Sequence, residues 1–251
     1  MGAYAAAVQA DSPNWWWRCN EAGGQLGLAA GTGLASAMAP QFVGASTGGY
    51  ASGGYGYSGI AADSGSLFIG RLSSFSAELD NATIPPGFAL EVWGCFPTRS
   101  NAYQDVTGGN GPALVGLFNR GVPWAVLSGF GHNLTVVANI GNGGTAYGVS
   151  TTKQLADVNF HHLVVVVGSG GCTVYGDGVS IGTGTGTAPT SATFDFQVYA
   201  PFNGTQGTPI VIAEVALYTG GLTATRVAAH YAAREITRRP QWRSSLSGIC
   251  Q

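Results

Sequence analysis

The sequence predicts an all-β protein: a two-sheet antiparallel jelly-roll sandwich with one short C-terminal helix and an extended C-terminal tail. Three observations predict this fold. Residues 160–181 contain a valine-rich run followed by two short returning segments, the pattern of consecutive antiparallel hairpins. Other short strand signals recur at even spacing between glycine-rich turns. Only one segment, near residue 230, has the apolar period of a helix.

The composition is that of a folded chain with few charges. Hydrophobic residues make up 45% of the sequence and charged residues 9%, and 41 residues are glycine. This excludes a disordered chain, which would need more charge and fewer apolar residues. Residues 1–225 hold 5 bases and 11 acids (−6) and residues 226–251 hold 5 bases and 1 acid (+4), which together give the net charge of −2. The end of the chain is therefore a basic arm on an acidic body, and the low charge favours packing against other chains.

No segment reaches the roughly 18 apolar residues of a membrane span, and residues 1–30 lack the basic start and apolar core of a secretion signal. Neither a membrane partner nor an export signal is therefore expected. The four cysteines lie far apart in the sequence, and three fall in predicted strands, so we expect free buried thiols rather than disulfides. They are Cys19, Cys95, Cys172 and Cys250.

The first part of the chain alternates strand signals with low-complexity sequence. We expect a strand at Tyr4–Gln9, a proline turn at 11–14 and a second strand over 15–19. Residues 22–62 are rich in Gly, Ala, Ser and Thr, and are either an excursion ordered by neighbouring chains or a binding surface. A strong strand signal at Phe88–Phe96 has bulky apolar residues at alternating and intervening positions, which predicts a strand covered on both faces.

The remaining strands follow from short apolar runs between turn residues. In the central hairpins, Asp177 and Gly178 are expected to take the positive φ angles of a tight two-residue turn. Residues 99–112 read as a polar loop. The further predicted strands are 66–72, 113–118, 124–127, 134–140, 163–167, 172–175, 179–181, 193–199 and 209–218.

One helix follows these strands. Thr223 can cap it, and an apolar stripe of Ala224, Val227, Ala228 and Tyr231 would dock on the sandwich, with Arg226 and Arg234 pointing elsewhere. Pro240 predicts that the helix ends near Arg239, because proline disfavours helical geometry in the residue before it. We therefore expect a single domain over 1–239 and an anchoring arm or tail over 240–251.

Three separated blocks of sequence resemble one family. Residues 4–21 combine an Asp-x-Pro turn with a Trp-Trp-Arg-x-x-Glu strand, and Phe88–Trp93 is a phenylalanine-to-tryptophan strand. The third block runs from Phe160 to Gly178 and continues through 212–218 and Leu222 to the helix at His230–Tyr231. Together they resemble the laminin-G-like, concanavalin A-like jelly-roll family, in the branch common in phage virion proteins and bacterial surface proteins. The resemblance covers about a third of the chain; residues 22–87 and 240–251 lie outside it.

The resemblance implies a sandwich that recognises sugars or proteins. It does not carry over a calcium site, because calcium-binding members have an Asp in the glycine-rich turn after the first block and an acid where this chain has Ala213. Here that turn is residues 23–34 and holds no acid. No cofactor and no metal are therefore expected, and calcium is kept only as a disfavoured alternative.

The sequence argues against an enzyme. Glycan-cleaving relatives of this fold carry paired carboxylates on one strand, whereas Glu91 and Asp195 stand alone between apolar neighbours and read as structural residues. Residues 178–182 and 54–59 match a nucleophile elbow and a dinucleotide fingerprint, but in the wrong structural context. His161 and His162 are strand neighbours that point to opposite faces, so they read as core or surface histidines. His132 and His230 have no partner in the sequence.

Two groups remain as binding candidates. Aromatic residues on predicted loops could stack on sugar rings or simply cover the sandwich: Tyr50, Tyr55, Tyr57, Tyr103 and Trp124. The basic arm could dock on a partner subunit, stay solvated or, least favoured for so few charges, bind nucleic acid; its residues are Arg234, Arg238, Arg239, Trp242 and Arg243.

These observations favour a non-enzymatic structural protein of a phage virion, either a capsid decoration or a tail-associated protein. Its expected partners are other virion proteins and copies of itself, and it could aid adsorption to host-surface glycans. The alternative is a carbohydrate-binding module of a bacterial cell-surface or secreted protein. A glycosidase is the third and weakest reading.

Overall fold

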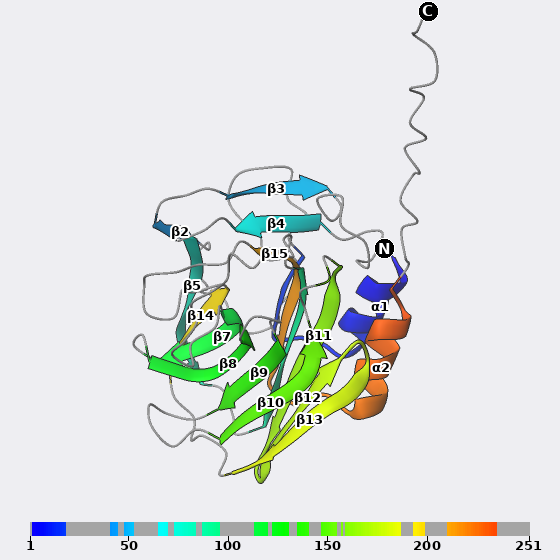
Figure 1. Cartoon of the computed structure of the whole chain (residues 1–251). Helices are drawn as coiled ribbons and strands as arrows, with labels where there is room; N and C mark the ends of the chain where they lie inside the picture. Colours follow the sequence, from blue (N-terminus) through cyan, green and yellow to red (C-terminus); the bar gives the residue numbers. More distant parts are fainter. Residues whose placement is uncertain are drawn as a thin grey trace, which may run out of the picture.

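The computed structural model describes most of the sandwich and the two helices that cover it. The described residues are 2–18, 41–44, 48–52, 65–69, 73–83, 87–95, 113–119, 122–130, 135–140, 147–154, 157, 159–186, 193–198 and 210–234. Helix α1 (Ala3–Ala10) opens this part of the chain and helix α2 (Ala224–Ala232) closes it (Figure 1). The strands between them form two antiparallel sheets, which confirms the predicted fold class.

The first sheet, which we call sheet A, has the order β13-β12-β11-β6-β15-β4-β3. Strand β1 also belongs to it, because β1 pairs with residues 215–217 of β15 while β4 pairs with residues 210–212 of the same strand. Its strands are β1 (Trp15–Trp17), β3 (Gly48–Ser52), β4 (Gly65–Ile69), β6 (Phe88–Cys95), β11 (His161–Gly168), β12 (Gly171–Gly176), β13 (Val179–Thr185) and β15 (Ile210–Tyr218).

The second sheet, sheet B, has the order β10-β9-β8-β7-β14-β5-β2. Its edge strand β10 lies beside β13, the edge strand of sheet A, so the two sheets meet along this side. Its strands are β2 (Gln41–Gly44), β5 (Ser73–Thr83), β7 (Ala113–Asn119), β8 (Val122–Phe130), β9 (Thr135–Ile140), β10 (Tyr147–Gln154) and β14 (Thr193–Val198).

The central hairpins are as predicted. Strand β11 pairs with β12, and β12 pairs with β13, all antiparallel. Asp177 and Gly178 connect the last two strands with φ angles of 53° and 81°. A tight hairpin turn needs this left-handed backbone, which glycine adopts without strain and aspartate tolerates better than most residues.

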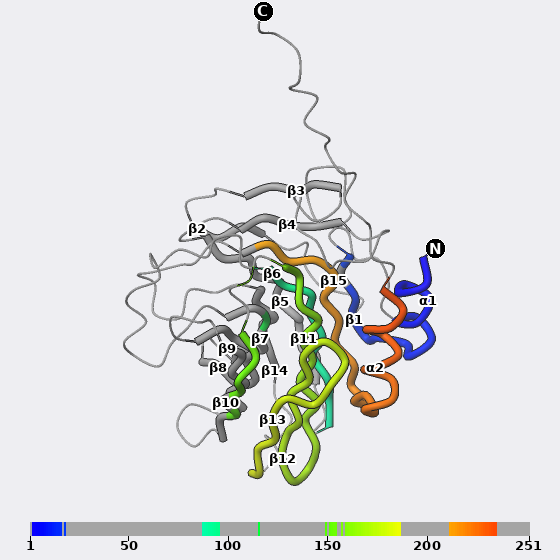
Figure 2. The backbone as a smooth tube through the Cα atoms, turned by 45° about the vertical axis from the view of Figure 1, so that its right-hand side comes forward, coloured from blue at the N-terminus to red at the C-terminus, as the bar shows by residue number. Residues whose placement is uncertain are grey.

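Strand β6 lies at the centre of sheet A, between β11 and β15. All eight of its residues are buried, as its sequence predicted. Helices α1 and α2 lie side by side against one face of sheet A (Figure 2). Successive side chains of β6 therefore point alternately into the interior of the sandwich and into the layer under the helices.

The N-terminal segment corrects a prediction. Residues 4–9 were expected to form a strand, but they lie in helix α1. Alanine is the best helix former and occurs five times in this eight-residue segment, AYAAAVQA. The helix buries Tyr4, Ala5 and Val8, and Ser12 and Pro13 follow its end. Alanine content and tertiary packing together outweigh the short apolar run on which the strand prediction rested.

Helix α2 confirms one prediction and corrects two. The Thr223 side chain accepts a hydrogen bond from the Arg226 amide at 3.2 Å, so the predicted cap is present. The helix ends at Ala232, not near Arg239, and Arg234 is already non-helical. Of the predicted stripe, Val227 is buried and Tyr231 packs against the core, but Ala224 and Ala228 are exposed, and His230 completes the buried face.

Several strands lacked a clear sequence signal. Strands β5 and β10, rich in Ser, Thr and other polar residues, were not predicted. Strands β2 and β3 lie within the low-complexity stretch 22–62, while the rest of that stretch and the loop 99–112 fall outside the described residues. Cys95 and Cys172 are buried free thiols, as expected; Cys19 and Cys250 are not described.

Candidate functional site

A buried carboxylate organises the layer between sheet A and the helices. Glu91 of β6 is fully buried, and four side chains from four other elements hydrogen-bond to it. We call this group the Glu91 centre: Glu91, Tyr4 of α1, His162 of β11, Tyr218 of β15 and His230 of α2. Its members are all buried.

Each oxygen of Glu91 accepts at least two hydrogen bonds. The Tyr4 hydroxyl and His162 Nε2 donate to Oε1, both at 2.7 Å. The Tyr218 hydroxyl donates to Oε2 at 2.7 Å, and His230 Nδ1 lies 3.0 Å from Oε2 and 3.2 Å from Oε1. This satisfies an ionised carboxylate in a place where an unpaired one would be very costly.

The electrostatics follow from burial and from these partners. Burial alone would raise the pKa of Glu91, but attraction to His230 and the hydrogen bonds from His162 and His230 outweigh it and hold the pKa well below its usual value. Burial, with the nearby Glu91 charge, raises the pKa of Tyr4 and Tyr218 well above the usual value for tyrosine. Both phenols therefore stay protonated and act as hydrogen-bond donors.

The centre extends to the surface through His230. His230 Nε2 lies 2.6 Å from Asp11 Oδ2, and Arg226 Nε lies 2.8 Å from each carboxylate oxygen of Asp11. Arg226 also donates from Nη2 to the backbone carbonyl of Ala7 in α1. Arg226 thus ties the two helices together, contrary to the expectation that it points away.

A second buried acid lies on β15. Glu214 accepts a hydrogen bond from Trp16 Nε1 at 2.7 Å and from Arg18 Nε at 3.2 Å. The Arg18 guanidinium also lies 5.1 Å from the centre of the Trp16 ring. This ion pair fastens the N-terminal strand β1 to the centre of sheet A.

A third polar group joins the two sheets where β10 meets the β12–β13 turn. Asp177 Oδ2 is paired with Lys153 of β10 and lies 3.0 Å from His161 Nδ1. Asp177 Oδ1 accepts from the His162 amide at 3.1 Å, and His161 Nε2 lies 2.9 Å from Asp157. Burial would raise the pKa of Asp177, but His161 and Lys153 together hold it far below the usual value. As predicted, His161 and His162 serve opposite faces of the strand.

An aromatic stack covers the Glu91 centre. The Tyr231 ring of α2 stacks on Trp93 and His162, with centroids 6.2 and 6.1 Å apart. The Arg234 guanidinium lies 3.4 Å from the centre of the Tyr231 ring, and Arg234 donates to the Tyr231 carbonyl at 2.9 Å. Arg234, predicted to point away, thus packs on Tyr231 of its own helix, while its predicted part in anchoring a partner stays a prediction.

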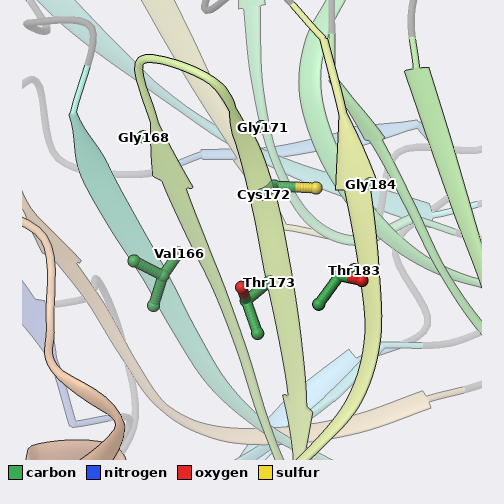
Figure 3. A pocket seen from close by; sticks show the side chains of 7 residues that line it. All are labelled: Val166, Gly168, Gly171, Cys172, Thr173, Thr183 and Gly184. Carbon is green, nitrogen blue, oxygen red and sulfur yellow. The ribbon is translucent and has the colours of Figure 1, made fainter.

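A hollow of about 330 Å³ lies on the outer part of sheet A (Figure 3). Val166, Thr173 and Thr183 form a row across β11, β12 and β13, because they are paired in register. Gly168, Gly171, Gly184 and Cys172 complete the lining. Burial raises the pKa of the Cys172 thiol to about 11, so it stays protonated at neutral pH. The hollow offers two hydroxyls and an apolar floor.

Most of the residues predicted to bind a ligand or a partner lie beyond what the structure describes. Tyr50 and Trp124 lie on strands β3 and β8, not on loops as predicted, and only their backbone is described. The other predicted residues fall outside the described part: Tyr55, Tyr57, Tyr103, Arg238, Arg239, Trp242 and Arg243. Their roles stay predictions. The described residues contain no group of three or more His, Cys, Asp or Glu side chains that could hold a metal, and no helix long and apolar enough to cross a membrane.

Sequence reasoning missed the Glu91 centre. Glu91 was correctly interpreted as structural, but its four partners were not foreseen, and His230 seemed to have none. A charged residue inside a fully apolar strand was the available signal, because such a residue must be paired when both faces are covered.

Comparison with known proteins places this geometry in a family. The family model of the concanavalin A-like lectin/glucanases superfamily matches residues 73–228, more than half of the chain. No curated protein shows a detectable match to the chain.

Solved structures share the fold at low sequence identity. Domain 4 of the extracellular GH43 arabinanase from Geobacillus stearothermophilus, in complex with arabinotriose, has 15% identity and a TM-score of 0.56, over 88% of this chain and 98% of that one. The binding domain of Paraclostridial Mosquitocidal Protein 1 has 14% identity and a TM-score of 0.57, over 76% of this chain and 47% of that one. The botulinum neurotoxin serotype D ligand binding domain, in complex with N-acetylneuraminic acid, has 9% identity and a TM-score of 0.55, over 92% of this chain and 52% of that one. The chain thus spans about half the length of the two toxin chains.

Proposed function

Because this chain belongs to the concanavalin A-like lectin/glucanase superfamily, we propose that it is a non-catalytic carbohydrate-binding domain that works at a cell or particle surface. The observation that carries the proposal is a lectin-like sandwich in which both acids at the centre of sheet A, Glu91 and Glu214, are buried. Two of the similar structures were solved with sugars, arabinotriose and N-acetylneuraminic acid, which supports a glycan as the class of ligand.

The buried acids argue against glycan cleavage. A glycosidase needs two carboxyl groups on either side of an accessible bond. Glu91 and Glu214 lie on neighbouring strands, but both are almost completely buried, and each is held by hydrogen bonds to aromatic, His or Arg side chains. A sugar could reach them only if the helices or β1 moved away. These acids therefore stabilise the fold.

Two surfaces could hold the sugar. The hollow on β11–β13 supplies the Thr173 and Thr183 hydroxyls beside Val166, a combination that suits the polar and apolar faces of a small sugar. The predicted aromatic residues, with Tyr103 and Trp124 foremost, would provide stacking surfaces. We propose the hollow as a subsite and the aromatics as an extension of it or a separate site.

A glycan array with the isolated chain tests the function. We expect binding to at least one class of cell-surface or cell-wall glycan. The Thr173→Val and Thr183→Val variants, which keep the side-chain shape but lose a hydroxyl, should each bind about fivefold to tenfold more weakly, the cost of about one hydrogen bond. Tyr103→Ala and Trp124→Ala test the second surface in the same way.

Ser180→Ala is the matched control, because Ser180 is exposed on the same strand as Thr183 but does not line the hollow. Silence of the unmodified chain across a broad array would overturn the function. Unchanged binding by both threonine variants, with loss in an aromatic variant, would instead move the site to the predicted aromatic residues.

The second candidate is a structural subunit of a phage virion, either a capsid decoration or a tail-associated protein, with other virion proteins and copies of itself as partners. The low charge of the chain and the basic arm after residue 225 favour it. None of the similar structures named above is a virion protein. A subunit of this kind should co-sediment with particles and lose that association when residues 240–251 are deleted; unchanged incorporation would contradict an anchoring arm.

A further inference from the structure

His230 lies between two carboxylates that belong to different layers of the molecule. Its Nδ1 is 3.0 Å from Glu91 Oε2 in the centre of sheet A. Its Nε2 is 2.6 Å from Asp11 Oδ2, in the turn that follows α1. The ring itself is fully buried in α2. One side chain therefore connects both helices to the sheet.

The other groups around His230 are accounted for. Tyr4 of α1 and Tyr218 of β15 place their rings 6.3 and 6.1 Å from the imidazole, and both donate to Glu91. His162 of β11 donates to Glu91 from the far side. Arg226, one turn earlier in α2, pairs with Asp11. Among the described residues, Glu91 and Asp11 are the charged groups that contact the ring directly.

Hydrogen-bond chemistry sets the protonation state. A neutral imidazole has one N–H, so it can donate to only one of these carboxylates and must turn a lone pair toward the other. The imidazolium has two N–H groups and donates to both. Each oxygen of Glu91 already has a hydroxyl or imidazole donor, so rearrangement of Glu91 cannot replace the missing bond.

We propose that the cap formed by α1, the 11–14 turn and α2 is a proton-dependent clasp, docked on sheet A while His230 carries two protons and loosened when it loses one. The cap covers Trp93, His162 and Tyr218, whose side chains face the helices. Loosening it would expose an aromatic and polar surface on the face of sheet A. In this way, one proton controls access to that surface.

The pKa of His230 supports the direction of the change. Burial would lower it, but the charges of Glu91 and Asp11 and their hydrogen bonds raise it above the ordinary value of 6.5. A histidine with a raised pKa stabilises the folded state fully below its unfolded pKa, and this contribution is lost as the pH rises through the folded pKa. The clasp is therefore closed near the ordinary histidine pKa and opens as the pH rises through the raised pKa of His230.

Two measurements on the intact chain test the clasp. The first is the ¹⁵N spectrum of the imidazoles, which distinguishes one from two protonated nitrogens. We expect His230 to be doubly protonated at pH 6 and to titrate above the ordinary histidine pKa. The second is amide hydrogen exchange between pH 6 and 9, corrected for the intrinsic effect of pH. Residues 3–10 and 224–232 should lose about tenfold more protection than strands β11 and β12 across the same titration.

Variants outside the most buried positions test the clasp without unfolding the chain. Substitution of Glu91 or His230 could unfold the chain, but Asp11→Asn removes only the outer carboxylate and should move the His230 titration and the loss of cap protection together to lower pH. His161→Gln is the matched control, because His161 also lies between two carboxylates but outside the cap. It should leave the opening pH unchanged.

Three results would overturn the clasp. One is a singly protonated His230 at pH 6. Another is cap protection that follows the hairpin strands at every pH. The third is an Asp11→Asn variant whose opening pH equals that of the unmodified chain.

Discussion

Asp177 and Gly178 form the turn between β12 and β13, and Gly178 also affects how α2 packs on the hairpin. Their dipeptide predicts a tight turn, and both have the positive φ angles that it requires. Gly178 has a second role: a Cβ atom at this position would lie 2.9 Å from the Tyr231 Cβ of α2. The missing side chain lets the helix approach the hairpin. That contact brings Tyr231 over Trp93 and His162.

Substitution of Gly178 tests this double role. Gly178→Ala should lower the free energy of unfolding by about 1–3 kcal/mol, because alanine is strained at positive φ and would displace Tyr231. Gly170→Ala is the control, since a Cβ there meets nothing within 4 Å. Urea unfolding measures both. Equal losses in the two variants would show that the contact with Tyr231 has no importance.

At the level of elements, the two sheets are fastened where β10 meets the β12–β13 turn. Asp177 makes this link through Lys153 of β10, and within sheet A it also contacts His161 and accepts the His162 amide hydrogen bond. The hairpin was predicted from its own residues, but β10 was not. The link between the sheets was therefore not foreseen, since it depends on two edge strands that are adjacent only in the folded sandwich.

Asp177→Asn should make the free energy of unfolding less dependent on pH in acidic solution. Asparagine tolerates the turn and can still accept the amide hydrogen bond, but it loses the charge that attracts Lys153 and His161. An aspartate with a lowered pKa stabilises the fold above its unfolded pKa, and this contribution is lost as the pH falls toward the folded value.

Urea unfolding should therefore show the variant about 1–3 kcal/mol less stable than the unmodified chain at pH 7, with the gap shrinking between pH 4 and pH 2. Asp157→Asn is the control and should have a smaller effect, because Asp157 is 46% exposed and lies beside the outer side of His161, where its carboxylate also accepts the Asn159 amide hydrogen bond. A gap that stays constant down to pH 2 would contradict the role given to the charge.

Helix α1 and helix α2 illustrate different limits of local patterns. Thr223 and the residues after it predict the start of α2, because a cap acts within four residues. The end of α2 and the identity of its buried face depend on what lies beneath it, namely Glu91 and Asp11 on one side and Trp93 on the other. In α1, a short alanine-rich segment carries no strong period. Its helical form is completed by packing against α2 and sheet A.

At the scale of the whole molecule, the Glu91 centre, the Glu214 pair and the Asp177 link join elements from both ends of the described chain. Such cross-connection favours cooperative unfolding.

The prediction of one domain over residues 1–239 then has a direct test. A chain that ends at residue 239 should unfold in one calorimetric transition, at the midpoint of the full chain. Two transitions, or a midpoint lower by more than about 4 °C, would mean that residues 240–251 belong to the folded domain.

The sequence by itself determines the class of fold, the central hairpins with their turn, the burial of β6 and the start of α2. Each depends on interactions between residues close in the chain: alternation along a strand, positive φ in a turn, a cap on a helix. Together with the quoted motifs, these patterns also identify the family, which the family model confirms.

The tertiary structure alone decides what Glu91 does. Its hydrogen-bond partners lie between 71 and 139 residues away in the sequence and come from two helices and two strands. No local period links them, because they meet only once β6 lies between β11 and β15 and both helices lie against the sheet. Burying a charge requires partners, but only the order of strands and helices in space decides which residues supply them.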